Sequence, residues 1–214
     1  MATRRVPLIS VLRATAVIAA LTLVAVLAGC GGGGGTASSG SSTPPLETAT
    51  GFAGAALPGS PPRHPFTLAD QSGRSVSLDD FRGQVTVLAF LSSACGAACV
   101  LIAQQIRGAL DELAHPVPVL FVSADPRVDT RARVARFLAQ VSLAGRARYL
   151  AGAPATLRAV WRAYRVTPAA AGRTAFDRAA TVRLLDRGGR ERVLFGLEQL
   201  TPEGLAHDIR KLAG

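Results

Sequence analysis

The sequence contains few cysteines and few of the motifs that mark common enzyme classes. Three cysteines in 214 residues are too few for a small domain held together by a set of disulfides. The sequence also has no phosphate-binding loop, no Ser, His and Asp set for nucleophilic catalysis, no zinc-ligand spacing and no internal repeat. The chain is long enough for one domain with a hydrophobic core and too short for two catalytic domains.

Acidic residues are also scarce. Asp and Glu number 14 against 24 Lys and Arg, which gives a formal net charge of +10. The basic residues are almost all Arg, and they are scattered through apolar, Ala-rich segments without a dense run or interleaved aromatic residues. A nucleic-acid partner is therefore not expected. This distribution suits a solvated surface or one that rests on anionic lipid.

Residues 1–29 have the layout of a secretory signal peptide. Arg4 and Arg5 precede an apolar stretch over residues 14–27, and small residues follow it before Cys30. The stretch is short for a membrane span, which needs about 20 apolar residues, and it leads into five glycines that a stable helix would not tolerate. We therefore predict that residues 1–29 are a signal peptide and not a transmembrane helix.

The end of this segment, Leu27-Ala28-Gly29-Cys30, resembles the lipobox of bacterial lipoproteins. The resemblance implies that Cys30 is acylated and becomes the first residue of the mature protein. Each acyl CH₂ group buried in the membrane contributes about 0.8 kcal/mol, so several chains anchor a protein firmly. We expect a lipoprotein on the bacterial cell membrane that faces outside the cytoplasm.

Residues 30–62 differ in composition from the rest of the chain. After Cys30 and five glycines, the segment is a mixture of Ser, Thr, Ala, Gly and Pro with almost no charge and few bulky apolar residues. Such a segment cannot bury enough apolar surface to order itself. We predict that it is a flexible tether and that residues 63–214 form the folded domain.

The folded part alternates between apolar runs and amphipathic segments, which predicts an α/β domain. The expected strands cover residues 66–70, 75–78, 85–91, 117–123, 147–150, 181–185 and 192–195, and the expected helices cover 99–113, 130–141, 154–164 and a closing segment that begins at 201–203. The run at 85–91 is apolar throughout, as in a strand buried on both faces. Together these elements predict a mixed β-sheet with helices on both faces.

Cys95 and Cys99 lie at the junction between the strand at 85–91 and the helix that follows it. Residues four apart on a helical turn share one face, so two thiolates there could hold a soft ion such as Cu(I). A disulfide instead requires Cys95 in the loop before the helix, which the small residues 96–98 permit. A helix N-terminus lowers the pKa of a thiol and favours the thiolate that either use requires. A purely structural disulfide remains a third interpretation, although so short a loop stabilises little.

Five stretches of the domain resemble the Sco/SenC family of copper-binding, thioredoxin-fold proteins that assist assembly of cytochrome c oxidase. They are Phe-Thr-Leu-Ala-Asp-Gln-Ser-Gly at 66–73, Cys-x-x-x-Cys at 95–99, Ser-Ala-Asp-Pro-Arg-Val-Asp-Thr at 123–130, Tyr-Leu-Ala-Gly at 149–152 and Tyr-Arg-Val at 164–166. The resemblance implies a thioredoxin-like fold with Cys95 and Cys99 as copper ligands or as a thiol/disulfide pair. It also implies a partner, which would be a copper subunit of cytochrome c oxidase or another thiol protein.

The sequence departs from the family pattern at the third copper ligand. The resemblance places a His eight residues before Asp186, where this chain has Arg178. A guanidinium stays protonated and offers no lone pair to a metal, so it cannot replace imidazole. Near two thiols it would favour thiolate and promote thiol–disulfide exchange, whereas in a shifted loop it would merely face solvent. The three histidines of the chain are expected at the surface: His64, His115 and His207.

The first prediction is therefore a Sco/SenC-like lipoprotein that acts in copper delivery or thiol redox during cytochrome c oxidase maturation. The alternative is a thiol–disulfide oxidoreductase that does not bind copper, and an interaction module braced by its disulfide is a third hypothesis. A Cu(I) site with the two thiolates alone remains chemically possible. Trp161 and Tyr164 recur at helical spacing and are expected in the core, and Asp129-Thr130 is expected to cap a helix.

Overall fold

The computed structural model describes residues 50–59, 61–169, 176 and 180–214. The predicted signal peptide, Cys30, the first part of the predicted tether and Arg178 lie outside these residues. None of the helices within the described residues is long and apolar enough to span a bilayer.

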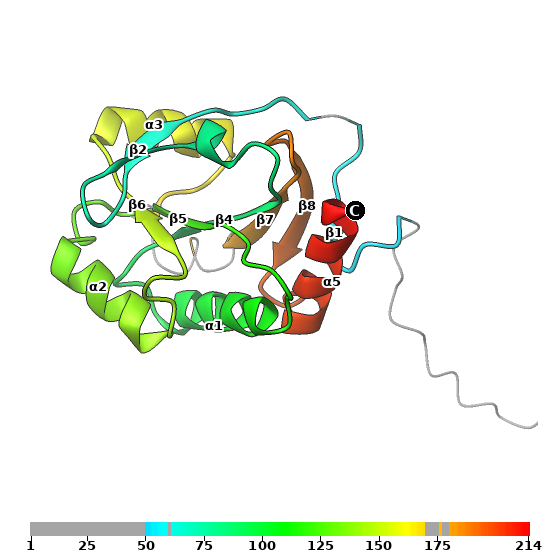
Figure 1. Ribbon diagram of the computed structural model, residues 1–214. Coiled ribbons are helices and arrows are strands. Elements are labelled where there is room, and N and C mark those ends of the chain that lie inside the picture. The colour runs from blue at the N-terminus through cyan, green and yellow to red at the C-terminus, as the bar shows by residue number, and fades with distance from the viewer. Residues whose placement is uncertain (1–49, 60, 170–175, 177–179) are drawn as a thin grey trace, which may run out of the picture. The chain divides into compact units, whose positions relative to one another are not determined.

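A six-stranded sheet forms the centre of the domain, with the strands in the order β1-β8-β7-β4-β5-β6 (Figure 1). Strand β4 pairs in parallel with β5, and β5 with β6, whereas β7 and β8 join as antiparallel strands on the other side of β4. The strands are β1 (Ala55–Ala56), β4 (Thr86–Leu91), β5 (Val119–Ser123), β6 (Arg148–Leu150), β7 (Thr181–Leu185) and β8 (Glu191–Gly196). The mixed sheet agrees with the prediction.

Helices cover both faces of this sheet, and β4 supplies side chains to both cores because residues alternate along a strand. One core packs Val87, Ala89 and Leu91 against α1 (Ala97–Asp111), α2 (Arg131–Gln140) and α5 (Pro202–Ala213). The other packs Leu88 and Phe90 against α3 (Pro154–Ala163) and a separate hairpin of β2 (Thr67–Ala69) and β3 (Ser75–Ser77). Figure 1 shows α3 and β2 on one side of the sheet and α1 and α2 on the other.

Most predicted elements are present, with ends that differ by a few residues. The turn after β3 is a short 3-10 helix, η1 (Leu78–Phe81). Helix α1 begins at Ala97, two residues before the predicted start, so Cys99 lies in its first turn. Trp161 and Tyr164 are buried in the core on the α3 side, as predicted.

The N-terminal edge of the sheet lies in the segment that the sequence analysis assigned to the tether. The N–H groups of Ala53 and Gly54 donate to the buried carboxylate of Asp208 at 2.8 and 2.9 Å, and β1 pairs with β8. A Cβ added to Gly54 would lie 2.6 Å from Cγ1 of Val193, so only glycine fits this close approach. The described structure thus includes residues before 63, which are held by backbone pairing with β8, by the Asp208 carboxylate and by the packing of Phe52 against the core.

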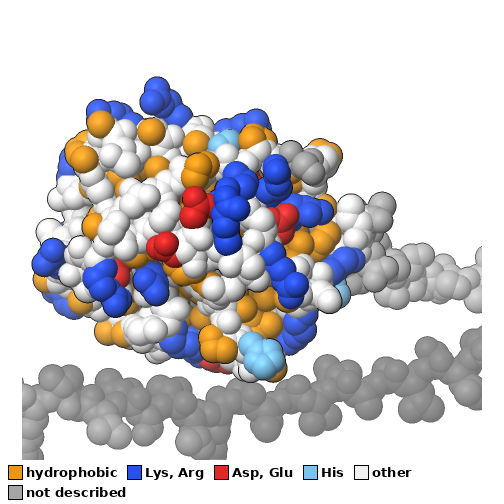
Figure 2. Space-filling model, turned by 45° about the horizontal axis from the view of Figure 1, so that its top comes forward, with side chains coloured by type: hydrophobic (Ala, Val, Ile, Leu, Met, Phe, Trp, Pro, Cys, Tyr) orange, Lys and Arg blue, Asp and Glu red, His pale blue; other side chains and the backbone are white. Residues whose placement is uncertain are grey.

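Positively and negatively charged side chains are interspersed on the surface. On the face drawn in Figure 2, Lys and Arg side chains are spread widely and Asp and Glu side chains lie among them. Arg63 and Arg82 both pair with Asp79, and Arg192 pairs with Asp186 at 3.3 Å. Part of the excess of arginine is therefore neutralised locally.

Candidate functional site

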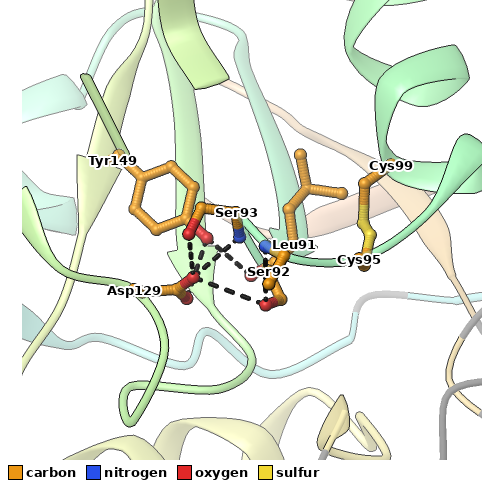
Figure 3. Close-up of a disulfide and its surroundings, with 8 residues drawn as sticks. Leu91, Ser92, Ser93, Cys95, Cys99, Asp129 and Tyr149 are labelled. Carbon is orange, nitrogen blue, oxygen red and sulfur yellow. Dashed lines mark hydrogen bonds between the residues drawn. A yellow bond between two sulfur atoms is a disulfide. The ribbon is translucent and has the colours of Figure 1, made fainter. Parts of the chain in front are cut away.

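Cys95 and Cys99 form a disulfide where the chain passes from β4 into α1 (Figure 3). Their Cα atoms are 5.9 Å apart. Cys95 lies in the loop before the helix, and its backbone N–H donates to the Ser92 carbonyl oxygen at 3.0 Å, closing a turn. Cys99 is the third residue of α1, whose N-cap position is Gly96.

The two sulfur atoms have different surroundings. Cys99 has 0% of its surface exposed and is part of the core on the α1 side, whereas Cys95 is half-buried at the edge of that core. Gly96 supplies no capping side chain, and the first turn of α1 has no acidic residue. The free N–H groups and the positive end of the helix dipole therefore favour a thiolate in this turn. Of the two sulfur atoms, that of Cys95 is therefore the more accessible to a thiolate from outside.

A cluster of polar side chains lies beside the disulfide, centred on the Asp129 carboxylate (Figure 3). Its Oδ1 accepts from the Ser93 N–H and Ser93 Oγ, both at 2.7 Å, and from Ser92 Oγ at 3.4 Å. Its Oδ2 accepts from Ser123 Oγ at 2.5 Å and from the Tyr149 hydroxyl at 2.9 Å. Asp129 is only 9% exposed. The cluster therefore ties the end of β4 to β5 and β6.

Tyr149 also contacts the last residue of β4. Its hydroxyl oxygen lies 2.9 Å from the Leu91 carbonyl oxygen, so one proton serves both this acceptor and Asp129. Burial, followed by the nearby Asp129 carboxylate, raises the pKa of Tyr149 well above its ordinary value. Tyr149 thus stays protonated and remains a donor.

Asp125 and Asp129, which the sequence places in one loop, have different roles. Asp125 receives two bonds from the Arg127 guanidinium, at 2.9 and 3.0 Å, and these bonds lower the pKa of Asp125 although partial burial opposes them. Thr130 is the N-cap of α2 and accepts from the Arg133 N–H. The predicted cap is therefore correct for Thr130 and wrong for Asp129, whose carboxylate faces the cysteine loop instead of α2.

The polar cluster was missed from the sequence, although a signal for it exists. Ser92 and Ser93 follow β4, Asp129 follows β5 within a few residues, and Tyr149 lies in β6. These three strands are parallel neighbours, so their carboxyl ends meet at one edge of the sheet. Polar residues gathered at those ends point to a common site.

The described residues offer two sulfur ligands to copper and no complete metal cluster. No group of three or more His, Cys, Asp or Glu side chains within the described residues could hold a metal ion. His115 and His207 are exposed, and His64 is half-buried with its ring against Tyr164. Once the disulfide is reduced, Cys95 in the loop before α1 and Cys99 in its first turn would supply two thiolates, the type of ligand that Cu(I) prefers.

The central mixed sheet and a cysteine pair at a strand-to-helix junction define a thioredoxin-like domain. A family model described as SCO1/SenC matches residues 55–214. The chain therefore belongs to the SCO1/SenC family. No curated protein matches it.

Solved structures of Sco proteins are similar to this chain. ScoI of Bradyrhizobium japonicum with copper bound is 29% identical, and the match covers 70% of this chain and 98% of that chain with a TM-score of 0.54. BsSco, a Sco-family cytochrome c oxidase assembly protein with a disulfide switch, is 19% identical over 74% and 97% of the two chains, with a TM-score of 0.60. A SCO1/SenC family lipoprotein of Bacillus anthracis str. Ames is 17% identical over 71% and 95%, with a TM-score of 0.55.

Proposed function

We propose that this SCO1/SenC-family protein is a membrane-anchored lipoprotein that acts through Cys95 and Cys99 in the maturation of cytochrome c oxidase. Its chemistry is thiol–disulfide exchange with a copper subunit of the oxidase or with another thiol protein. The observation that carries this proposal is the disulfide between half-buried Cys95 and fully buried Cys99 in the first turn of α1. The family membership and the assembly role of BsSco support the biological setting.

The exchange follows from the unequal exposure of the two sulfur atoms. A partner thiolate attacks Cys95 Sγ, a mixed disulfide forms, and Cys99 leaves as a thiolate that α1 stabilises. The second thiolate of the partner then attacks the partner's sulfur atom in the mixed disulfide. This forms a disulfide within the partner and releases Cys95 as a thiolate. Two electrons pass from the partner dithiol to the pair, the partner becomes a disulfide, and the protons exchange with solvent. The same steps run in reverse when the partner is oxidised.

The anchor is proposed on residues outside the described part of the chain. The lipobox-like Leu27-Ala28-Gly29-Cys30 supports acylation of Cys30, and a related SCO1/SenC protein is a lipoprotein. From Cys30 to Thr50 the segment has the composition of a flexible linker, for which the root-mean-square span is roughly 25 Å. In this proposal the domain can meet a partner that stands close to the membrane.

Delivery of Cu(I) is a second function, with copper as cargo. The two thiolates of the reduced pair support it, as does the copper bound by the relative from Bradyrhizobium japonicum. Arg178, which stands where the family pattern has a His, argues for exchange chemistry without copper. The two functions differ in whether the natural chain holds Cu(I) tightly.

An anaerobic titration of the reduced protein with Cu(I) against a competing chelator decides between them. Exchange chemistry alone predicts negligible binding by the natural chain and one-to-one binding by Arg178→His. Tight one-to-one binding by the natural chain would establish copper handling without the third ligand. The Cys95→Ser, Cys99→Ser double variant is the control and should bind no Cu(I) in either background.

A cellular test addresses the biological role. In the source bacterium, replacing both cysteines by Ser should lower cytochrome c oxidase activity as much as removing the whole protein. Oxidase activity that stays unchanged with both cysteines replaced, but falls when the protein is removed, would contradict the proposal. That outcome would make the domain an interaction module in which the disulfide is a brace.

A further inference from the structure

Asp129 is a buried carboxylate held only by uncharged donors. Five hydrogen bonds reach its two oxygens, and no Arg, Lys or His of the described residues forms an ion pair with it. Taking a carboxylate out of water without a cation is costly, so hydrogen bonds must offset the loss of hydration. Every donor around the carboxylate is therefore part of one arrangement, and a change in one affects the others.

Three of these donors belong to the turn that carries Cys95: Ser92 Oγ, the Ser93 N–H and Ser93 Oγ. The Ser93 N–H and hydroxyl both donate to Asp129 at 2.7 Å. Ser92 Oγ also accepts from the Ala94 N–H at 3.3 Å, and the Ser92 carbonyl oxygen accepts from the Cys95 N–H at 3.0 Å. A chain of hydrogen bonds thus runs from Asp129 through Ser92 and Ser93 to the backbone of Cys95.

The end of β4, just before this turn, is fixed as well. Leu91 O accepts from the Ala124 N–H at 2.8 Å and from Tyr149, which is itself bonded to Asp129. Cys99 is held independently by α1 and its core. The position of Cys95 relative to Cys99 therefore depends on how firmly the turn is held, and Asp129 holds the β4 end of that turn directly through Ser92 and Ser93 and indirectly through Tyr149.

We propose that Asp129 is a positioning residue that keeps Cys95 Sγ within bonding distance of Cys99 Sγ and so stabilises the disulfide over the dithiol. The inference rests on the proposed function in one respect, that the pair cycles between these two states. An interaction that is stronger in one of two states shifts the equilibrium toward that state by the difference in its free energy between the two. Asp129 should therefore raise the equilibrium constant for forming the disulfide.

The test is a redox equilibrium with glutathione. The full chain in detergent carries Cys30→Ala, so that Cys95 and Cys99 are its only thiols, and thiol content is measured across mixtures of glutathione and glutathione disulfide. Reduction consumes two glutathione molecules and yields one glutathione disulfide and the dithiol. Asp129→Ala should lower the equilibrium constant for disulfide formation about tenfold, which equals a rise in reduction potential of about 30 mV. Asp129→Asn keeps one oxygen for the Ser93 N–H and should have a smaller effect.

Asp125→Asn is the matched control, because Asp125 lies in the same loop but bonds to Arg127 and to neither Ser92 nor Ser93. It should leave the equilibrium constant within about twofold. Urea unfolding of the oxidised and reduced forms gives the second readout. A positioning role predicts that Asp129→Ala destabilises the oxidised form more than the reduced form. Equal loss in both forms with an unchanged equilibrium constant would mean that Asp129 only stabilises the fold, and it would overturn the proposal.

A milder variant covers the case in which Asp129→Ala does not fold. Ser93→Ala removes one donor to Asp129 and keeps the backbone N–H, so the equilibrium constant should fall about threefold. No change in Ser93→Ala together with no change in Asp129→Asn would also overturn the proposal. The measurement needs no physiological partner, so its failure is distinct from a failure of the proposed function, which the cellular test detects.

Discussion

Arg183 of β7 and Glu191 of β8 form a buried ion pair, with Arg183 Nε 3.1 Å from Glu191 Oε1. The Arg183 side chain is only 8% exposed, and its other nitrogens donate to Thr181 Oγ1 and to the Tyr164 carbonyl oxygen at 2.6 and 2.9 Å. Its guanidinium also lies over the Phe90 ring. We predict that Arg183→Ala lowers the free energy of unfolding by about 3 kcal/mol, because it leaves the Glu191 carboxylate, whose side chain is only 15% exposed, without its cation.

The double variant Arg183→Met, Glu191→Leu is the matched comparison for this pair. It removes both charges together and should unfold at nearly the same urea concentration as the natural chain. A double variant as unstable as Arg183→Ala would mean that the destabilisation comes from losing the hydrogen bonds of Arg183 to Thr181 and Tyr164, and not from the unpaired charge of Glu191.

The unequal exposure of the two cysteines predicts which variant traps a partner. In Cys99→Ser, the Cys95 thiolate can attack glutathione disulfide and release one glutathione, but no second cysteine resolves the adduct. Mass spectrometry should therefore find one glutathione on Cys99→Ser and far less on Cys95→Ser, because Cys99 is fully buried. Equal labelling of the two variants would show that the first turn of α1 opens readily in the reduced protein.

The proposed acylation of Cys30 predicts a defined mature N-terminus. The protein purified from bacterial membranes should begin at Cys30 and carry acyl chains, visible as added mass on its first peptide. Cys30→Ala should lose this mass, and Cys95→Ser should keep it. An unmodified Cys30 in the natural chain would refute the lipid anchor while leaving the chemistry of the domain untouched.

The β2–β3 turn predicts a dependence of stability on pH through Asp70. Burial alone would raise the pKa of Asp70, but hydrogen bonds from the Ser72 hydroxyl and from the N–H groups of Arg74 and Ser72 outweigh it and lower the pKa to about 2. Because the folded pKa lies below the ordinary value of 3.8, the stabilisation is complete above that value and is lost as the pH falls toward 2. Its size is no more than about 2.5 kcal/mol.

This dependence is measured by urea unfolding at several pH values. Asp70→Asn should be less stable than the natural chain near neutral pH, and the difference should shrink as the pH falls. Asp111→Asn is the control, since its ion pairs with Arg107 and Arg146 are exposed and should contribute little. A difference between Asp70→Asn and the natural chain that stays constant with pH would contradict the assignment.

The fold could be predicted from the sequence wherever apolar patterning decides it. The apolar run ending at Leu91 became a strand with every residue buried, and Thr201 with Pro202 marked the start of α5. Strand β1 could not be predicted in this way, because its residues are small, it pairs with β8 far along the chain, and the N–H of the preceding Gly54 donates to the Asp208 carboxylate 154 positions away. Patterns of hydrophobicity do not detect pairing through backbone groups.

The position of the cysteine pair could be predicted from the sequence, but the polar side chains around it could not. The spacing of Cys95 and Cys99 at a strand end was readable, since a strand-to-helix junction is a local feature. The role of Asp129 was not, because the same Asp-Thr sequence suits a helix cap and only the packing of three strands turns the carboxylate toward Ser92 and Ser93. Residues that act through long-range contacts need the fold before their role can be recognised.

If the proposed lipid on Cys30 anchors the domain, strand β1 determines how the domain would respond to a mechanical pull. It is a two-residue edge strand, separated from β4 by β8 and β7, and the segment before it is held by Lys211 and Asp208 of α5. Tension along the tether would break these few contacts first. Unpeeling residues 50–57 would lengthen the proposed tether by on the order of 25 Å and leave β4, α1 and the disulfide between Cys95 and Cys99 folded, so the reach of an anchored domain would grow under load while its cysteine site stays intact.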